Sequence, residues 1–222
     1  MEDPFFPVFL SLRVALTAMV FVVPAGIALA WLQASRAHRF RGFVDGLILL
    51  PMVLPPSVIG FFLVWLFGRR GLFGHALNGL GVRLIFTPWA AVLASATVAL
   101  PVLVKAAQPA METVPRELLV IGRSLGLAPV EVFFRVVLRG AWRGVATGIV
   151  LAFVRAIGEF GATLMFAGNI PGRTNTMTIE IWSAYQGGDE SRALSYVVVL
   201  TALGLATVFL SARIAPSPSR PR

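Results

Sequence analysis

The chain has 222 residues, of which 57% are hydrophobic and only 13% are charged, and it contains no cysteine. Soluble domains carry about 25% charged residues, so this composition excludes an ordinary soluble protein, and the lack of cysteine excludes disulfides and thiolate metal sites. The net charge of +9 would suit a nucleic-acid partner, but in a membrane protein the positions of the arginines matter more than their sum.

Five apolar segments approach the length of about 20 residues that a membrane-spanning helix needs. We place these predicted spans at about residues 8–34, 45–68, 85–108, 143–168 and 193–213, with a long loop at about 109–142. The sequence therefore predicts an all-α integral membrane protein with about five transmembrane helices, forming one domain over residues 1–222.

The arginines of this chain gather on one side of the membrane when the N-terminus is placed outside. The inner side then holds Arg36, Arg39, Arg41, Arg116, Arg123, Arg135, Arg139, Arg143, Arg213, Arg220 and Arg222. The outer side holds only Arg69, Arg70, Arg83, Arg173 and Arg192. The positive-inside rule thus predicts an outer N-terminus and a cytoplasmic C-terminus.

The second predicted span contains Pro51, Pro55 and Pro56. Each proline removes a backbone donor and kinks or breaks a helix interior, and non-helical backbone at membrane depth needs cover from protein or a water-filled cavity. We expect this span to pack inside a bundle, either lining a path or serving only as a kinked packing helix. In the third span, Lys105 is expected to extend to the inner interface.

The long inner loop has the signals of a helix, a short turn and a second helix. Thr113 is the expected cap of the first helix, with Pro115 at an early position, and Gly126 is its expected end. Ala128 and Pro129 start the second helix. One face of the first helix carries Leu118, Ile121 and Leu125.

Three functions compete for this helical loop. DNA binding is disfavoured because spans tether both ends and the arginines are scattered rather than presented by one recognition helix. A docking element for a cytoplasmic partner fits the mixed apolar and basic surface better. A hairpin that merely lies on lipid headgroups remains an alternative.

The sequence lacks the motifs of common enzymes. Lys105, the only lysine, does not follow a phosphate-binding loop, and His38 and His75 lie in opposite loops without a metal-binding or hydrolase motif. We therefore expect no catalytic residue, no metal and no cofactor on this chain, so any ATP-driven process needs another subunit.

Arg155 and Glu159 are charged residues inside the fourth predicted span. Four residues apart on a helix, they would share one face and offset each other's desolvation. Charged groups at membrane depth mark functional paths by default. The sequence leaves two alternatives open, which are a translocation path and a structural ion pair.

A turn rich in glycine and proline follows the fourth span. Gly168, Pro171 and Gly172 surround Asn169, and Arg173 comes directly after them. This predicted outer turn is where an external ligand or binding protein would first meet the bundle.

Residues 155–177, RAIGEFGATLMFAGNIPGRTNTM, resemble the signature of the permease subunits of bacterial molybdate-type ABC importers, which are related to sulfate permeases. The run GEFGATLMFAGNIPGRT is closer to the molybdate and tungstate branch than to the sulfate branch. Five spans with a loop between the third and fourth are also the plan of the type I importer permeases in this family.

The inner loop is similar to the family's ATPase-coupling loop, whose pattern is Glu-Ala-Ala, three residues, Gly, nine residues, Ile-x-Leu-Pro. Aligned on Gly126, the chain supplies Val136 and Leu138 at the Ile and Leu positions. The sequence departs at residues 120–122, which are Val-Ile-Gly, and at Arg139 in place of Pro. Glu117, one turn earlier, is a candidate for the missing acid.

The resemblance implies a homodimeric pore in the inner membrane, cytoplasmic ATPases that bind ATP-Mg, and an external oxyanion-binding protein. The residues expected to engage the ATPase are Glu117, Arg123, Ser124, Leu125, Gly126, Leu127, Ala128, Pro129, Val130 and Glu131. The expected cargo is molybdate or tungstate, with sulfate or thiosulfate as the alternative within the class. A stand-alone channel or membrane scaffold is the alternative from another class. The predicted spans show no ring of basic residues, so selectivity is expected mainly in the binding protein.

Overall fold

The computed structural model describes residues 3–35 and 41–214, and every regular element within these ranges is helical. The all-α prediction is confirmed for this part of the chain. Arg36, Arg39, Arg220 and Arg222, which entered the charge count above, lie outside the described residues, as does His38.

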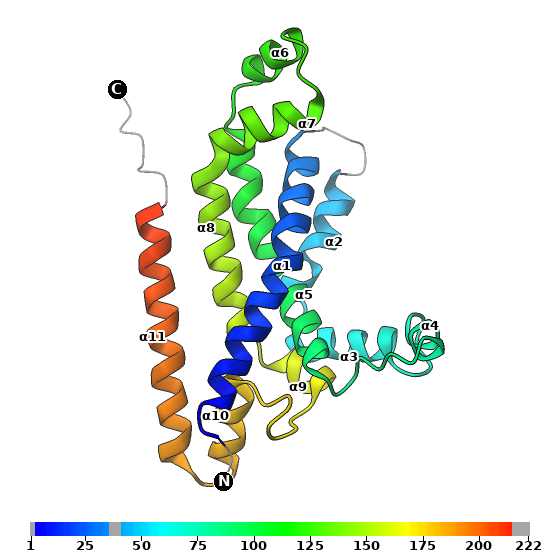
Figure 1. The fold of residues 1–222 in the computed structure, drawn as a ribbon, viewed down its shortest axis with the longest axis vertical. Helices are drawn as coiled ribbons and strands as arrows, with labels where there is room; N and C mark the ends of the chain where they lie inside the picture. The colour runs from blue at the N-terminus through cyan, green and yellow to red at the C-terminus, as the bar shows by residue number, and fades with distance from the viewer. Residues whose placement is uncertain (1–2, 36–40, 215–222) are drawn as a thin grey trace.

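The helices follow one another as shown in Figure 1. Their bounds are α1 (Phe6–Ser35), α2 (Arg41–Val53), α3 (Pro56–Phe67), α4 (Gly74–Gly79), α5 (Pro88–Glu112), α6 (Arg116–Ser124), α7 (Pro129–Val132), α8 (Leu138–Ile157), α9 (Gly161–Ala167), α10 (Met177–Gln186) and α11 (Glu190–Ile214). A π-helical turn, Phe133–Val137, joins α7 to α8.

Four helical stretches in the described residues are long and apolar enough to cross a membrane, namely α1, α5, Pro129–Ile157 and α11. Together α2 and α3 are long and apolar enough for a fifth crossing, but they are bent by 111°, as in a broken span or a re-entrant loop. The bend falls at Pro55 and Pro56, where the chain lacks two backbone donors. The predicted number of about five spans is therefore confirmed when the broken pair is counted as one.

The two halves of the broken span differ in how they pack. Within the single chain α2 contains no fully buried residue and meets the bundle through Ile48 and the Asp45–Lys105 pair, so the expected packing inside a bundle is only partial for this half. α3 packs against α9, where a Cβ placed on Gly60 would lie 2.6 Å from the Cβ of Met165. The small size of Gly60 thus lets α3 and α9 approach closely.

The core of the bundle lies along α5, which packs between α1 and α8. Three glycines of α8, four residues apart, face small or branched residues. Gly144 faces Ala110 and Gly148 faces Ala106 of α5, and Gly140 faces Val114, which follows α5 directly. A Cβ on Gly144 would lie only 2.2 Å from the Cβ of Ala110. Such small-residue seams let membrane helices approach closely and gain dispersion contacts. By contrast, α11 packs at the edge of the bundle (Figure 1).

The fourth span has bounds different from those expected. We placed it at residues 143–168, but the helix runs through the π-helical turn to Ile157, and α9 is a separate short helix. The break has a physical cause, since the carboxylate of Glu159 accepts a hydrogen bond from the Ala162 N–H and so satisfies a free donor at the start of α9. The predicted loop at 109–142 shortens accordingly, to the residues between α5 and α7.

Two local predictions on α5 need correction. Thr113 ends α5 instead of capping α6, because its hydroxyl donates to the Ala110 carbonyl at 2.8 Å, and Pro115 precedes the first residue of α6. Lys105 forms a 2.9 Å ion pair with Asp45 of α2. This lysine therefore joins α2 to α5, a contact that the expectation of a side chain directed to the interface did not include.

Candidate functional site

The hairpin formed by α6 and α7 (residues 116–132, called the 116–132 hairpin below) is closed by a tight turn. Gly126 has φ of +81°, its N–H donates to the Arg123 carbonyl, and the Leu127 N–H donates to the Gly122 carbonyl. These two bonds form a Schellman motif, which satisfies carbonyls at a helix C-terminus and needs glycine at the left-handed position. The predicted end of the first helix at Gly126 is confirmed.

The second helix of the hairpin begins as expected at Ala128 and Pro129. The carboxylate of Glu131 accepts the Ala128 N–H at 2.9 Å and pairs with Arg135 at 3.5 Å. The turn is thus held by bonds within the chain, and its geometry does not depend on a partner.

The 116–132 hairpin projects from one end of the bundle (Figure 1). Several of its apolar side chains are exposed. Leu125 is 75% exposed, and the other exposed apolar residues are Leu118, Val120, Ile121 and Val130. Of the ten residues expected to engage an ATPase, Leu127 and Glu131 are half-buried and the other eight are exposed. The structure therefore presents these residues together on one projecting surface.

Arg155 and Glu159 form the expected ion pair, with 2.7 Å between Nη1 and Oε2. Glu159 lies beyond the end of α8, however, so the premise of one continuous helix was wrong. Its side chain is 1% exposed, its second oxygen accepts the Ala162 N–H, and its carbonyl accepts the Thr178 hydroxyl. Both carboxylate oxygens are thus occupied by the chain itself, which favours the structural alternative over a path.

The turn after α9 is fixed by side-chain hydrogen bonds, and we call residues 168–180 the 168–180 segment. The Thr174 hydroxyl accepts the Ile170 N–H and donates to the Gly168 carbonyl. The Asn169 amide donates to the Ser183 hydroxyl at 3.2 Å. Gly168 and Gly172 have φ of +72° and +67°, which explains why this turn uses glycine twice.

The end of the 168–180 segment is anchored to distant parts of the chain. The Met177 N–H donates to the Ser11 hydroxyl of α1 at 2.8 Å. Glu180, which is buried, pairs with Arg192 at 2.6 Å and accepts the Asn175 amide at 3.2 Å. These contacts place the segment at the end of the bundle opposite the 116–132 hairpin (Figure 1).

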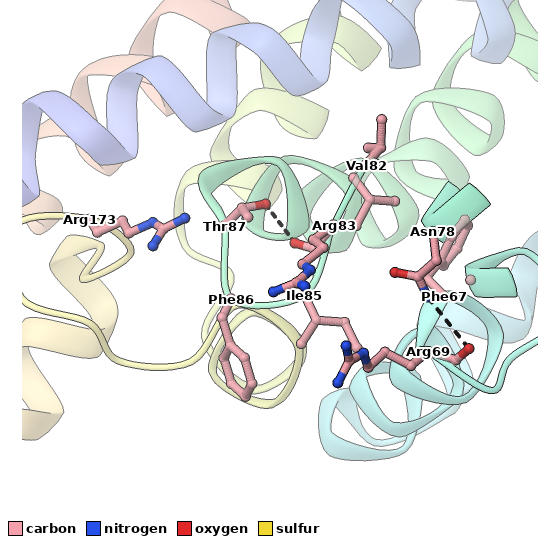
Figure 2. Close-up of a pocket in the computed structure, with 11 residues that line it drawn as sticks. Phe67, Arg69, Asn78, Val82, Arg83, Ile85, Phe86, Thr87 and Arg173 are labelled. Carbon is pink, nitrogen blue, oxygen red and sulfur yellow. Dashed lines mark hydrogen bonds between the residues drawn. The ribbon is translucent and has the colours of Figure 1, made fainter. Parts of the chain in front are cut away.

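A cavity of about 380 Å³ lies beside the 168–180 segment (Figure 2). Three arginines from separate parts of the chain line it, namely Arg69 after α3, Arg83 before α5, and Arg173. Its remaining wall includes the Asn78 and Thr87 side chains and several apolar residues.

Sequence reasoning assigned Arg173 to the outer turn and Arg69 and Arg83 to the outer side, but it missed that the three line one cavity. It also missed the Glu180–Arg192 pair and the glycine seam of α8. The four-residue spacing of Gly140, Gly144 and Gly148 was a local signal for close helix packing. The arginine cavity had no local signal, because its residues are far apart in the chain.

The long apolar helices, the small-residue seam between α5 and α8 and the projecting hairpin define a polytopic membrane protein. A family model described as "Binding-protein-dependent transport system inner membrane component" matches residues 22–220. The chain belongs to this family.

Curated relatives match over most of the chain. It is 38% identical over 206 residues to the molybdenum transport system permease protein ModB of Escherichia coli K12, covering 92% of this chain and 90% of the relative. It is 40% identical over 194 residues to the ModB of Mycobacterium tuberculosis, covering 87% and 74%. A solved bacterial ABC transporter involved in the import of alginate has the same fold, with a TM-score of 0.74 at 14% identity and coverage of 97% and 82%.

Proposed function

We propose that this chain is the membrane-spanning permease subunit of an ATP-driven importer that moves a tetrahedral oxyanion, molybdate or tungstate, into the cytoplasm. The observation that carries this proposal is the 38% identity with a molybdenum permease over 92% of the chain. Residues 155–177, which resemble the permease signature of molybdate-type importers, add to this support.

The 116–132 hairpin is the proposed docking site for a cytoplasmic ATPase that binds ATP-Mg. Its exposed leucine, valine and isoleucine side chains support this role, because a projecting apolar surface marks a site of interaction. Arg116 and Arg123 lie in the hairpin and Arg135 and Arg139 follow it, which supports placing this end in the cytoplasm under the positive-inside rule. The N-terminus is then outside.

Two copies of the chain and an external binding protein complete the proposed transporter. Exposed apolar residues on α2 and α3, among them Phe43, Leu47, Phe61 and Trp65, offer surface for the second copy or for lipid. Movement of the hairpins on ATPase closure would alternate the access of a central path between the two sides. The binding protein meets the opposite end, where the 168–180 segment lies.

Reconstitution of the complex with its binding protein tests the function. We expect ATPase activity to rise when the binding protein is loaded with molybdate or tungstate, and not when it is offered sulfate at the same concentration. Stimulation by sulfate alone would assign the chain to sulfate transport. Recovery of the chain from native membranes in mild detergent without an ATPase would contradict the proposal and favour a stand-alone channel or scaffold.

A further inference from the structure

The cavity beside the 168–180 segment carries positive charge with no acidic residue in its wall. Arg69, Arg83 and Arg173 line it, and each is exposed. The sequence between Asp45 and Glu112, which supplies ten of the eleven lining residues, contains no aspartate or glutamate at all. Neutralising charge for this cavity must therefore come from elsewhere.

Three acidic residues near this end of the described chain, Glu159, Glu180 and Asp189, already have basic or backbone partners. Glu159 pairs with Arg155 and Glu180 pairs with Arg192. Asp189 accepts the backbone N–H of Arg192 at the start of α11. None of the ion pairs found among the described residues involves an arginine of the cavity, so its charge remains available to an anion from solution.

The wall of this cavity is held in a strained conformation. Phe86 has φ of +61°, the only positive value among the described non-glycine residues. Its N–H donates to the Phe166 carbonyl of α9 at 3.2 Å, and its ring packs on Gly168, where a Cβ would lie 2.8 Å from the ring. Such strain persists only where the surrounding structure enforces it, and it clusters at functional sites.

This contact joins the cavity to the 168–180 segment. Gly168 begins the turn and leaves room for the Phe86 ring, while Arg173 from the same turn enters the cavity lining. Figure 2 shows Arg83 and Phe86 on the stretch before α5, with Arg173 approaching from the other loop. Gly168, through its contact with Phe86, and Arg173, directly, therefore both contribute to the wall of the same cavity.

We propose that Arg69, Arg83 and Arg173 form an outer vestibule that collects the divalent tetrahedral oxyanion before it enters the path. Guanidinium groups suit this cargo because they form charge-assisted hydrogen bonds with oxyanions and never lose their charge. The cavity, at about 380 Å³, has room for the ion with water around it. It thus raises the local anion concentration and does not select by tight fit. The vestibule proposal rests on the proposed function only for the identity of the ion that is transported.

Direct binding tests the vestibule without transport. The chain has no cysteine, so Val82→Cys in the cavity wall gives a single site on it for a fluorescent label. The permease–ATPase complex without binding protein is titrated with molybdate, sulfate and perchlorate at constant ionic strength, and a labelled complex lacking Val82→Cys gives the background. We expect both divalent ions to change the fluorescence and the monovalent tetrahedral perchlorate to act at least about fivefold more weakly.

Substitution of the arginines sharpens the binding test. Arg83→Gln and Arg173→Gln should each raise the half-saturating molybdate concentration about threefold to fivefold, which is the range for exposed charge pairs. Arg70→Gln is the matched control, because Arg70 is the exposed neighbour of Arg69 but does not line the cavity. It should leave the titration unchanged. Equal responses to perchlorate, or equal effects of Arg70→Gln and Arg83→Gln, would overturn the vestibule.

Transport distinguishes this proposal from the proposed function. In proteoliposomes with loaded binding protein, the variant with all three arginines changed to Gln should take up molybdate at least about tenfold more slowly at low ionic strength. Its affinity for the binding protein should be unchanged.

Normal uptake by this variant refutes the vestibule and leaves the proposed function intact. A parallel loss of binding-protein affinity also refutes it, since the arginines would then hold the protein and not the ion. Anion binding by a wild-type complex that transports no oxyanion supports the vestibule and refutes the proposed function.

Discussion

The 168–180 segment and the 116–132 hairpin lie at opposite ends of the bundle and differ in which side chains they bury and which they expose. Thr174, Asn175, Thr176 and Glu180 are polar residues that the first segment buries, and bonds within the chain hold them. The hairpin exposes apolar residues such as Leu125, which the single chain leaves uncovered.

The difference indicates where each region finds its stability. Buried polar groups cost free energy unless they are hydrogen-bonded, so the 168–180 segment depends on its internal network. An exposed apolar surface is covered only when a partner binds. Changes in the first region should therefore affect folding, and changes in the second should affect assembly.

The largest expected loss of stability comes from removing the carboxylate of Glu159. Glu159→Ala leaves Arg155 and the Ala162 N–H without their acceptor, and breaking a fully buried pair costs about 3–5 kcal/mol. Because Arg155 is 36% exposed, we expect the lower part of that range, about 3 kcal/mol. Thermal unfolding of the purified chain in detergent measures this loss.

Glu159→Gln is the matched control for charge, since it keeps an acceptor for the Ala162 N–H. We expect it to assemble and to unfold at a temperature between those of the wild type and Glu159→Ala. Normal assembly with loss of transport would instead place Glu159 in the path, which would contradict the structural role that its bonding favours.

Replacing either of two glycines in the left-handed conformation, Gly168 and Gly126, should reduce the free energy of unfolding less than Glu159→Ala does, and by different amounts. Gly168→Ala suffers backbone strain and also brings a Cβ within 2.8 Å of the Phe86 ring, so we expect about 2 kcal/mol. Gly126→Ala meets no atom within 4 Å and should cost only the backbone strain, about 1 kcal/mol. Unfolding midpoints of the two variants, compared side by side, measure the difference.

Larger side chains at Gly126 should act on assembly more than on stability. Gly126→Trp distorts the turn between α6 and α7 and should uncouple ATP hydrolysis from uptake while the chain stays in the membrane. Unchanged oxyanion uptake in this variant would refute the docking role of the hairpin, and equal unfolding midpoints for the two alanine variants would remove the contrast between the regions.

The smallest effect on stability, and a clear effect on assembly, is expected for Leu125→Asp. Leu125 is 75% exposed, so the change should move the unfolding midpoint of the isolated chain very little. Placing a charge in the proposed docking surface should reduce co-purification of the ATPase at least about tenfold. Leu72→Asp, in the exposed connection between α3 and α4, is a control away from the hairpin. If both variants retain the ATPase equally, the hairpin is not the docking surface.

The features that sequence reasoning found depend on short-range physics. The hydropathy of residues 85–108 predicts α5, and Gly126 followed by Pro129 predicts the turn of the hairpin. Both signals lie within a few residues of the structure they specify. The spacing of Arg155 and Glu159 also predicted their contact, although the helix ends between them.

The features that it missed depend on distant contacts. The end of the fourth span at Ile157 was missed because 158–168 is as apolar as a span, and only the bond from Ala162 to Glu159 shows where α9 begins. Lys105 meets Asp45 across two helices, and Arg192 meets Glu180 across a turn. No local pattern specifies which charges become neighbours when helices pack.

The glycine seam between α5 and α8 has a mechanical consequence for the 116–132 hairpin, which connects these two helices. Gly144 leaves no room for a side chain against Ala110, so the two helices pack here with their backbones close together. Because α5 and α8 pack closely along their length, we expect a displacement of the hairpin to move the two helices together. Because α5 also packs along α1, such a movement would be felt in the middle of the bundle as well as at its cytoplasmic end.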